Sequence, residues 1–322
     1  MTESDGIDVS AKAKSKKRVV LHCGAPKTGS TSLQWFIDDH KDALRTDGAV
    51  CPGRFVVRSD VDPIHRAFVA MRHRGNPAQA IAAAQDRLAE LFARDDIHTV
   101  LISNESMLGE PFVDGKDAFF PIFERSLDQL KDVFRDYDVH VIYFIRDFAS
   151  FLPSYYVQDV RRGGSRSFAQ FCADIDFTTL NWRDRVAALK AAFGDDRVMV
   201  VEHAALRRDG KGTFERSFGQ YFPSLPPFKE QAYDKNRSIG GPVLQIYRLM
   251  NWLFARLVPA RVAKRGRRFM RQVIFAPLGR LAGPRRFRAD TVVAEEMHQK
   301  YEADRAALGL CGNQPKTSGK SE

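Results

Sequence analysis

The sequence predicts an α/β fold in which helices flank an open, mostly parallel sheet, followed by a basic helical C-terminal extension. Short, nearly continuous apolar runs indicate the strands, because strands buried on both faces have this pattern. These runs span residues 18–23, 98–103, 139–145 and 197–202. Segments of helical periodicity fill the gaps, notably 77–94, 120–136 and 180–193. Such alternation is typical of a parallel sheet, whose ligands bind outside the carboxyl ends of the strands.

The composition is that of a basic globular protein. The chain has 322 residues and a formal net charge of +10, from 50 Lys and Arg against 40 Asp and Glu. This excess favours an anionic partner without choosing among nucleotides, acidic sugars, nucleic acid and membrane surfaces. The four cysteines form no C-x-x-C pair, which argues against a structural zinc site or a disulfide framework. No apolar run approaches a membrane span, and the N-terminus lacks a secretory signal, so we expect a soluble, cytoplasmic protein.

Changes in composition divide the chain into four parts. Residues 1–17 and 313–322 are polar and without periodicity, so both are expected to be disordered tails. Residues 18–251 form the predicted α/β domain. Residues 252–312 form the basic extension, which is expected to contain a helix at 290–308 and to pack on or beside the domain.

The first predicted strand leads into the loop HCGAPKTGSTSLQ, residues 22–34. Gly24 and Gly29 have the spacing of the nucleotide-triphosphate P-loop, but Lys27 lies before the second glycine instead of after it. A helix is expected from Ser30 to about His40, and the free N–H groups at its start favour an anion. The candidate phosphate-binding residues are Gly24, Lys27, Thr28, Gly29, Ser30, Thr31 and Ser32.

This loop resembles the 5′-phosphosulfate-binding loop of the sulfotransferases that use PAPS (3′-phosphoadenosine 5′-phosphosulfate). It is most similar to the bacterial carbohydrate-type branch, whose loop reads H-x-G-x-x-K-[TS]-G-[TS]-[TS]-x-L-Q. The resemblance implies a P-loop-like, nucleotide-binding fold, PAPS as sulfuryl donor, PAP as product and no requirement for a metal. It also implies that Lys27 contacts the oxygen that bridges sulfate and phosphate.

A second anion site is expected after the strand at 139–145. Arg146 follows this strand, and a helix is expected behind it, with Ser150 as N-cap, Pro153 in the first turn and Gly163 at its C-terminal end. Arg146 and Ser154 have the spacing of the family's 3′-phosphate motif, an arginine at a strand end with a serine eight residues on. The resemblance therefore implies that both contact the 3′-phosphate, a group that ATP lacks.

The general base is expected among residues near the same sheet edge. Glu105 follows the strand at 98–103. Carbohydrate sulfotransferases use a glutamate at this kind of position as the base, so the resemblance makes Glu105 the first choice. The alternative is that Glu105 caps the next helix. His65 is a second candidate for the base, because cytosolic sulfotransferases use a histidine. The alternatives are that His65 lines the acceptor pocket or has a structural role. His22 is expected to be packed on its strand. No cluster of Asp, Glu and His has metal-ligand spacing.

Two later segments carry weaker signals. Residues 233–251 resemble the Asn-x-Ser segment of bacterial relatives, which implies that Asn236 and Arg237 close over the nucleotide. Residues 254–288 are strongly basic and match no motif. They form either a solvated helical face, a contact with an anionic membrane at its inner surface, or a site for an acidic polysaccharide.

The expected function is metal-independent transfer of a sulfuryl group from PAPS to a hydroxyl acceptor, a carbohydrate or lipid-linked glycan. An ATP-dependent P-loop kinase and a non-catalytic protein that binds polyanions or membranes remain as alternatives. No motif indicates a nucleic-acid partner.

Overall fold

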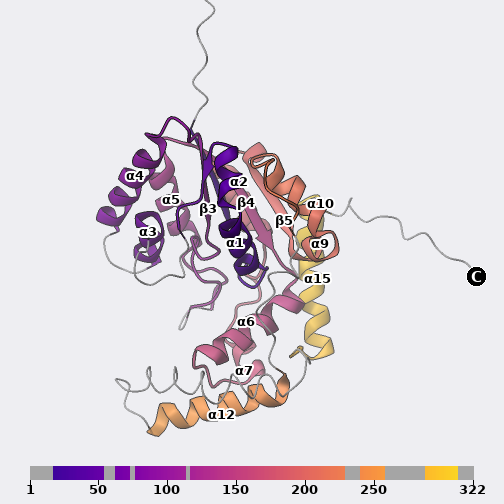
Figure 1. Ribbon diagram of the computed structural model, residues 1–322. Helices are drawn as coiled ribbons and strands as arrows, with labels where there is room; N and C mark the ends of the chain where they lie inside the picture. Colours follow the sequence, from indigo (N-terminus) through magenta and orange to yellow (C-terminus); the bar gives the residue numbers. More distant parts are fainter. Residues whose placement is uncertain are drawn as a thin grey trace, which may run out of the picture.

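The computed structural model describes residues 17–53, 62–72, 77–113, 117–228, 240–257 and 287–310. Its centre is one parallel sheet with the strand order β2-β3-β1-β4-β5 (Figure 1). The strands are β1 (Arg18–Gly24), β2 (Ala49–Val50), β3 (Thr99–Ser103), β4 (Asp138–Ile145) and β5 (Val198–Glu202). The predicted α/β class and the four predicted strands are confirmed. The two-residue β2 is too short to leave a pattern in the sequence.

Helices cover both faces of the sheet. The α-helices before β4 are α1 (Ser30–Asp39), α2 (Lys41–Thr46), α3 (Pro63–Arg72), α4 (Ala78–Phe92) and α5 (Phe123–Phe134). Those after β4 are α6 (Phe148–Arg162), α7 (Phe168–Ala173), α8 (Arg183–Phe193), α9 (His203–Arg208), α10 (Gly210–Phe214), α12 (Gly241–Leu257) and α15 (Thr291–Ala307). A 3₁₀ turn, η1 (Asp195–Arg197), and a π-helix, η2 (Glu215–Gly219), complete them. The predicted helices at 77–94, 120–136, 180–193 and 290–308 are confirmed, each slightly shorter than expected.

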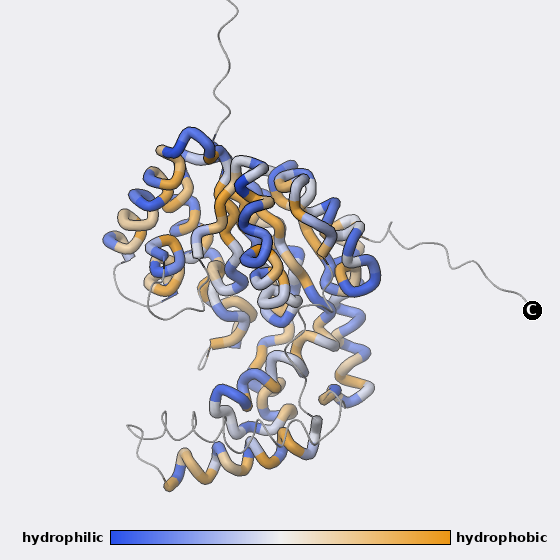
Figure 2. The backbone as a smooth tube through the Cα atoms, in the orientation of Figure 1, coloured by the Kyte–Doolittle hydropathy of each residue, from blue (hydrophilic) through white to orange (hydrophobic). Residues whose placement is uncertain are grey.

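Alternate residues of the strands build two cores. Val19 and Leu21 of β1 belong to the core shared with α3 to α8, whereas Val20 belongs to the core shared with α1, α2, α9 and α10. Figure 2 shows the hydrophobic strands between helices whose outward turns are largely hydrophilic. Burial on both faces explains why the strands read as continuous apolar runs instead of alternating ones.

The strand order brings three chain turns together. β1 is the central strand, with β3 on one side and β4 on the other. In register, His22 pairs with Ser103 and Gly24 with Phe144, so the three strands end at one edge. The loop after β1, the turn after β3 and Arg146 after β4 are therefore neighbours, as expected for the ligand edge of a parallel sheet.

The C-terminal part packs on α6. Helices α12 and α15 both contact α6, and α12 lies far from the sheet at the lower end of the molecule in Figure 1. Helix α12 runs unbroken across 251/252, so the expected domain boundary falls inside a helix. Residues 258–286, which make up most of the basic segment 254–288, lie outside the described residues, as do nearly all of both predicted tails. No helix in the described ranges has the length and apolarity that crossing a membrane requires.

Candidate active site

The loop after β1 is held against β4. Gly24 has a φ of +125°, and a Cβ at this position would lie 2.2 Å from the carbonyl oxygen of Phe144. The N–H of Ala25 donates to that same oxygen at 2.7 Å. Gly24 is therefore required where the backbone of β1 approaches that of β4.

We expect Gly24→Ala to destabilise the fold by about 2–4 kcal/mol, since it combines an unfavourable φ with a backbone overlap that no rotamer relieves. Thermal unfolding followed by circular dichroism measures this loss. The matched control is Gly309→Ala, because Gly309 also has a positive φ, of +70°, but open space around its Cβ position. An equal loss in both variants would show that φ alone, and not the contact with β4, makes Gly24 necessary.

The loop presents its amides and its lysine at the start of α1. Lys27 has a left-handed φ of 67°, an unusual conformation for a residue with a side chain, and Gly29 follows with φ 83° as the N-cap. Glycine has no side chain to cap the helix, so the first N–H groups of α1 receive no side-chain cap. The hydroxyl of Thr28 donates to the carbonyl of Ala25 at 2.7 Å and closes the curl. These features make an anion-binding site of the loop.

The hydroxyl-bearing residues of the loop differ in exposure. Thr28, Ser30 and Ser32 are buried, whereas Thr31 is exposed. The Thr28 and Ser30 hydroxyl oxygens lie 3.3 Å apart.

Lys27 lies in a strongly positive environment. Its pKa is lowered first by burial and then by the charges of Arg161, Arg146 and Arg162, and only Glu105 opposes them. A cluster of cations that is partly shielded from water is unfavourable by itself, because like charges repel and little solvent screens them. It is suited to a ligand with several negative charges.

Arg146 is fixed beside this loop. Its Nη1 donates to the carbonyl oxygen of Lys27, and its Nε donates to the hydroxyl of Ser150 at 2.9 Å. The carbonyl of Arg146 accepts from the indole N–H of Trp182 at 2.9 Å, and Trp182 is buried against Phe148. The strand, the following helix and a buried indole together hold the guanidinium at the mouth of the site.

The start of α6 differs from the expectation. Asp147, not Ser150, is the N-cap, because its carboxylate accepts from the N–H of Ala149 at 2.9 Å and starts the helix at Phe148. Pro153 therefore lies past the first turn, inside the helix. Ser154 lies in the second turn, four residues after Ser150 and so on the same face of α6. Arg146 contacts Ser150, while Ser154 stays half-buried.

Gly163 ends α6 as predicted, with φ 122°. Arg161 and Arg162 occupy the last turn.

Glu105 reaches the site from the end of β3. It lies in a turn, and the next helix, α5, begins only at Phe123, so the capping alternative does not hold. Gln34 of α1 donates from Nε2 to the Glu105 carboxylate at 3.3 Å and to the Ser103 carbonyl at 3.2 Å. Burial raises the pKa of Glu105, and nearby Glu110 adds to this, while Gln34 and Lys27 oppose it. Glu105 is thus a carboxylate of increased basicity close to Lys27.

His65 has a structural position. It is buried on α3, with Nε2 at 3.0 Å from the carbonyl oxygen of Gly53 and Nδ1 at 3.3 Å from the side-chain nitrogen of Asn104. Burial lowers its pKa, which favours the neutral ring. Because both ring nitrogens are engaged, the geometry does not support His65 as the base. His65 instead contacts the side chain of Asn104, the residue that precedes Glu105.

His22 is packed on its strand, as predicted. Its Nδ1 lies 2.7 Å from the Ser103 hydroxyl, and burial lowers its pKa to about 3.

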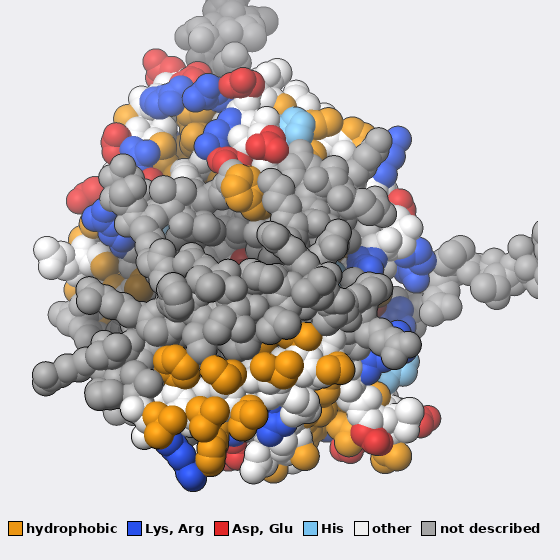
Figure 3. All heavy atoms as spheres, turned by 60° about the horizontal axis from the view of Figure 1, so that its bottom comes forward, with side chains coloured by type: hydrophobic (Ala, Val, Ile, Leu, Met, Phe, Trp, Pro, Cys, Tyr) orange, Lys and Arg blue, Asp and Glu red, His pale blue; other side chains and the backbone are white. Residues whose placement is uncertain are grey.

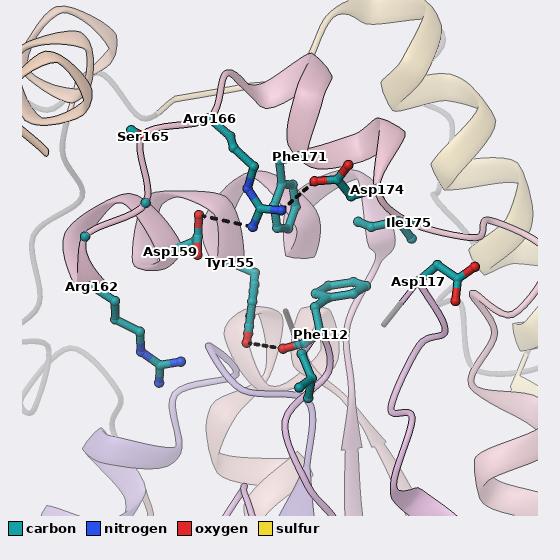
Figure 4. Close-up of a pocket in the computed structure, with 13 residues that line it drawn as sticks. Phe112, Asp117, Tyr155, Asp159, Arg162, Ser165, Arg166, Phe171, Asp174 and Ile175 are labelled. Carbon is teal, nitrogen blue, oxygen red and sulfur yellow. Dashed lines mark hydrogen bonds and ion pairs between the residues drawn. The ribbon is translucent and has the colours of Figure 1, made fainter. Parts of the chain in front are cut away.

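A cavity of about 980 Å³ opens beside the site (Figure 4). The end of α6, the turn after it, α7 and the three residues Phe112, Val113 and Asp117 supply its walls. Its lining includes the aromatic residues Phe112, Tyr155 and Phe171, the acids Asp117, Asp159 and Asp174, and the arginines Arg162 and Arg166. Arg166 forms ion pairs with Asp159 and Asp174. Arg162 lines the cavity, and its charge also lowers the pKa of Lys27, so this arginine acts on both the cavity and the anion site.

Sequence reasoning missed Gln34, Ser150 and Glu110. Glu110 lies between the two parts of the site, because its carboxylate accepts from Tyr155 at 3.3 Å, Arg72 at 3.4 Å and Arg162 at 3.5 Å. A spacing pattern could have indicated Ser150, which lies four residues from Arg146. Gln34 is the last residue of the loop motif at 22–34, so that motif could have indicated it, whereas no local signal indicates Glu110, whose partners are distant in the sequence.

Some expectations concern residues that the structure does not describe. Asn236 and Arg237 lie in 229–239, outside the described residues. Over the described ranges, no three His, Cys, Asp or Glu side chains are grouped so that they could hold a metal ion. The cysteines at 23, 51 and 172 are free thiols.

Comparison with known proteins finds distant structural similarity. A sulfotransferase from Alicyclobacillus acidocaldarius has a TM-score of 0.42 at 14% identity, over 77% of this chain and 94% of that one. The sulfotransferase domain of the Synechococcus PCC 7002 olefin synthase has 0.41 at 15% identity, over 77% and 98%. A mouse sulfotransferase complexed with PAP has 0.41 at 10% identity, over 93% and 90%. No family model and no curated protein sequence matches the chain.

Proposed function

We propose that the chain is a PAPS-dependent sulfotransferase that transfers a sulfuryl group to a hydroxyl acceptor. The observation that carries this proposal is the position of Lys27. It lies inside an anion-binding loop, where the charges of Arg146, Arg161 and Arg162 lower its pKa and the nearby carboxylate of Glu105 raises it. This arrangement combines strong binding of an anion with a nearby base.

The residues present fit a donor with anionic groups at both its 5′ and 3′ positions. The uncapped N–H groups of α1, with Lys27 and the loop hydroxyls, would hold the 5′-phosphosulfate. Arg146 would hold the 3′-phosphate, with Ser150 and Ser154 on the facing side of α6. Asn236 and Arg237 remain proposed contacts to the nucleotide.

PAPS, when bound, supplies the sulfuryl group and leaves as PAP. In this proposal, the Lys27 ammonium stabilises the negative charge that collects on the bridging oxygen as the sulfur–oxygen bond breaks. Glu105 accepts the proton of the acceptor hydroxyl while the oxygen of that hydroxyl bonds to sulfur. The raised pKa of Glu105 favours this role, because a more basic carboxylate binds the proton more strongly.

We propose a glycan or lipid-linked glycan as the acceptor. The cavity beside Arg162 supports this choice, because aromatic rings suit the apolar faces of sugars and carboxylates accept hydrogen bonds from their hydroxyls. Arg166 is already paired with two acids, which leaves few cations for an acidic acceptor.

Calorimetric titration tests the donor assignment. We expect PAP to bind at least about tenfold more tightly than ATP, a difference of about 1.4 kcal/mol. Arg146→Ala should weaken PAP binding by about 10–100-fold, since a hydrogen bond to a charged group is worth about 1.5–3 kcal/mol. The same variant should bind AMP, which lacks the 3′-phosphate, as the wild-type protein does. Tighter binding of ATP than of PAP would instead favour a P-loop kinase and overturn the proposal.

A further inference from the structure

Helix α12 is apolar on two opposite faces. Its inner face buries Val243, Leu244 and Tyr247 against the rest of the protein. Its outer face exposes large apolar side chains, and the exposed fractions are 43% for Ile246, 58% for Leu249, 42% for Trp252 and 75% for Leu257. Figure 3 shows hydrophobic side chains gathered at this end of the molecule. A surface helix normally turns polar residues outward, so this face is suited to being covered.

The charge around this outer face is positive. Helix α12 contains no Asp or Glu, and the Arg256 guanidinium lies 4.2 Å from the centre of the exposed Trp252 ring. In the sequence, every charged residue from 258 to 286 is Arg or Lys. Apolar side chains, an exposed tryptophan and adjacent cations are the composition of a helix that lies on an anionic bilayer.

A second copy of the chain is a less suitable partner. Two α12 outer faces packed together would bring Arg256 of both copies into an interface for which this helix supplies no carboxylate. An anionic lipid surface offers a partner for the Arg256 charge on this face.

The inner face of α12 supports a wall of the cavity. The side-chain nitrogen of Asn251 donates to the carbonyls of Val160 at 2.7 Å and Gly164 at 2.8 Å. The Nε of Arg248 donates to the carbonyl of Ser165 at 3.3 Å. Gly164 and Ser165 belong to the turn that lines the cavity, so α12 lies directly behind that wall.

We propose that the outer face of α12 docks on an anionic membrane surface, and that docking brings the cavity next to acceptors carried by the membrane. The helix lies along the interface and does not span the bilayer. The docking depends only on α12, whereas the second step rests on the proposed function, with a lipid-linked glycan as its acceptor.

Vesicle flotation with the full-length chain tests the docking. We expect flotation with vesicles of phosphatidylcholine and phosphatidylglycerol, and little with phosphatidylcholine alone. Binding should weaken as salt increases, and the emission of exposed Trp252 should shift to the blue. Equal flotation with both vesicles, or none with either, would overturn the proposal.

Substitutions on α12 locate the contact. Leu249→Glu should weaken vesicle binding by at least about tenfold, because it puts a charge into the apolar interface. Leu249→Ser, which adds no charge, should weaken it less. The control is Ala83→Glu, which adds the same charge at an exposed position of α4 and should bind as the wild type does. Unchanged binding by Leu249→Glu would refute docking through this face.

Two further measurements separate the alternatives. Light scattering that shows a dimer of the wild type and a monomer of Leu249→Glu would assign the face to self-association and reject membrane docking. Calorimetric titration of the same variants with PAP tests the fold of the site, and we expect unchanged affinity. Flotation without PAP binding would retain the docking and reject the sulfotransferase proposal, and PAP binding without flotation would do the reverse.

Discussion

Lys27→Met is expected to lower the rate of sulfuryl transfer by about 10²–10³-fold, the usual effect of removing a group that stabilises developing charge. Methionine keeps the length of the side chain and removes only the ammonium. The rate is measured as transfer from radiolabelled PAPS to an acceptor identified by screening glycans, lipids and small alcohols. The affinity for PAP should fall less than the rate, because Arg146, Arg161 and Arg162 remain.

The same substitution should not weaken the fold. Lys27 is partly buried among three arginines, which lower its pKa, so removing its charge relieves repulsion in the ligand-free protein. We expect the melting temperature of Lys27→Met to equal or exceed that of the wild type. Lys41→Met is the control, because Lys41 is exposed and forms a surface ion pair with Asp38, and it should alter neither property strongly. Retained activity in Lys27→Met would remove the proposed role of this lysine.

The loop could be found from the sequence because its glycine spacing is that of a phosphate-binding loop and Lys27 lies between the two glycines. Lys27 in a left-handed conformation, between glycines, departs from what a stable turn alone requires. Such departures are expected at functional sites. The three site regions could also be predicted, since Gly24, Glu105 and Arg146 each follow an apolar run and parallel strands end at one edge.

The remaining parts of the site depend on contacts between distant segments. Gln34 meets Glu105 only because α1 packs beside the end of β3. Arg161 and Arg162 lie in the last turn of α6, and their effect on Lys27 depends on how α6 lies relative to the loop. The sequence left the role of His65 open, because it shows a histidine but not the backbone carbonyls that lie near its ring.

Glu105→Gln is expected to lower the transfer rate by about 10²–10⁴-fold, the usual contribution of a general base. Glutamine has the same shape, and its carbonyl oxygen still accepts from Gln34. The affinity for PAP should be unchanged or slightly higher, because a negative charge near Lys27 has been removed. A loss of rate without a loss of affinity separates a catalytic role from a structural one.

The pH dependence gives a second readout of the same residue. Burial raises the pKa of Glu105, so the wild-type rate should rise with pH through a value above the ordinary 4.5 and then level off. Glu105→Gln should lack this rise, whereas the exposed control Glu124→Gln should keep it. The folded protein also binds this proton more tightly than the unfolded chain, so ionisation of Glu105 lowers stability as pH rises through that range. Glu105→Gln should therefore be more stable than the wild type at neutral pH. If Glu105→Gln kept both the transfer rate and its pH dependence, the general base would lie elsewhere.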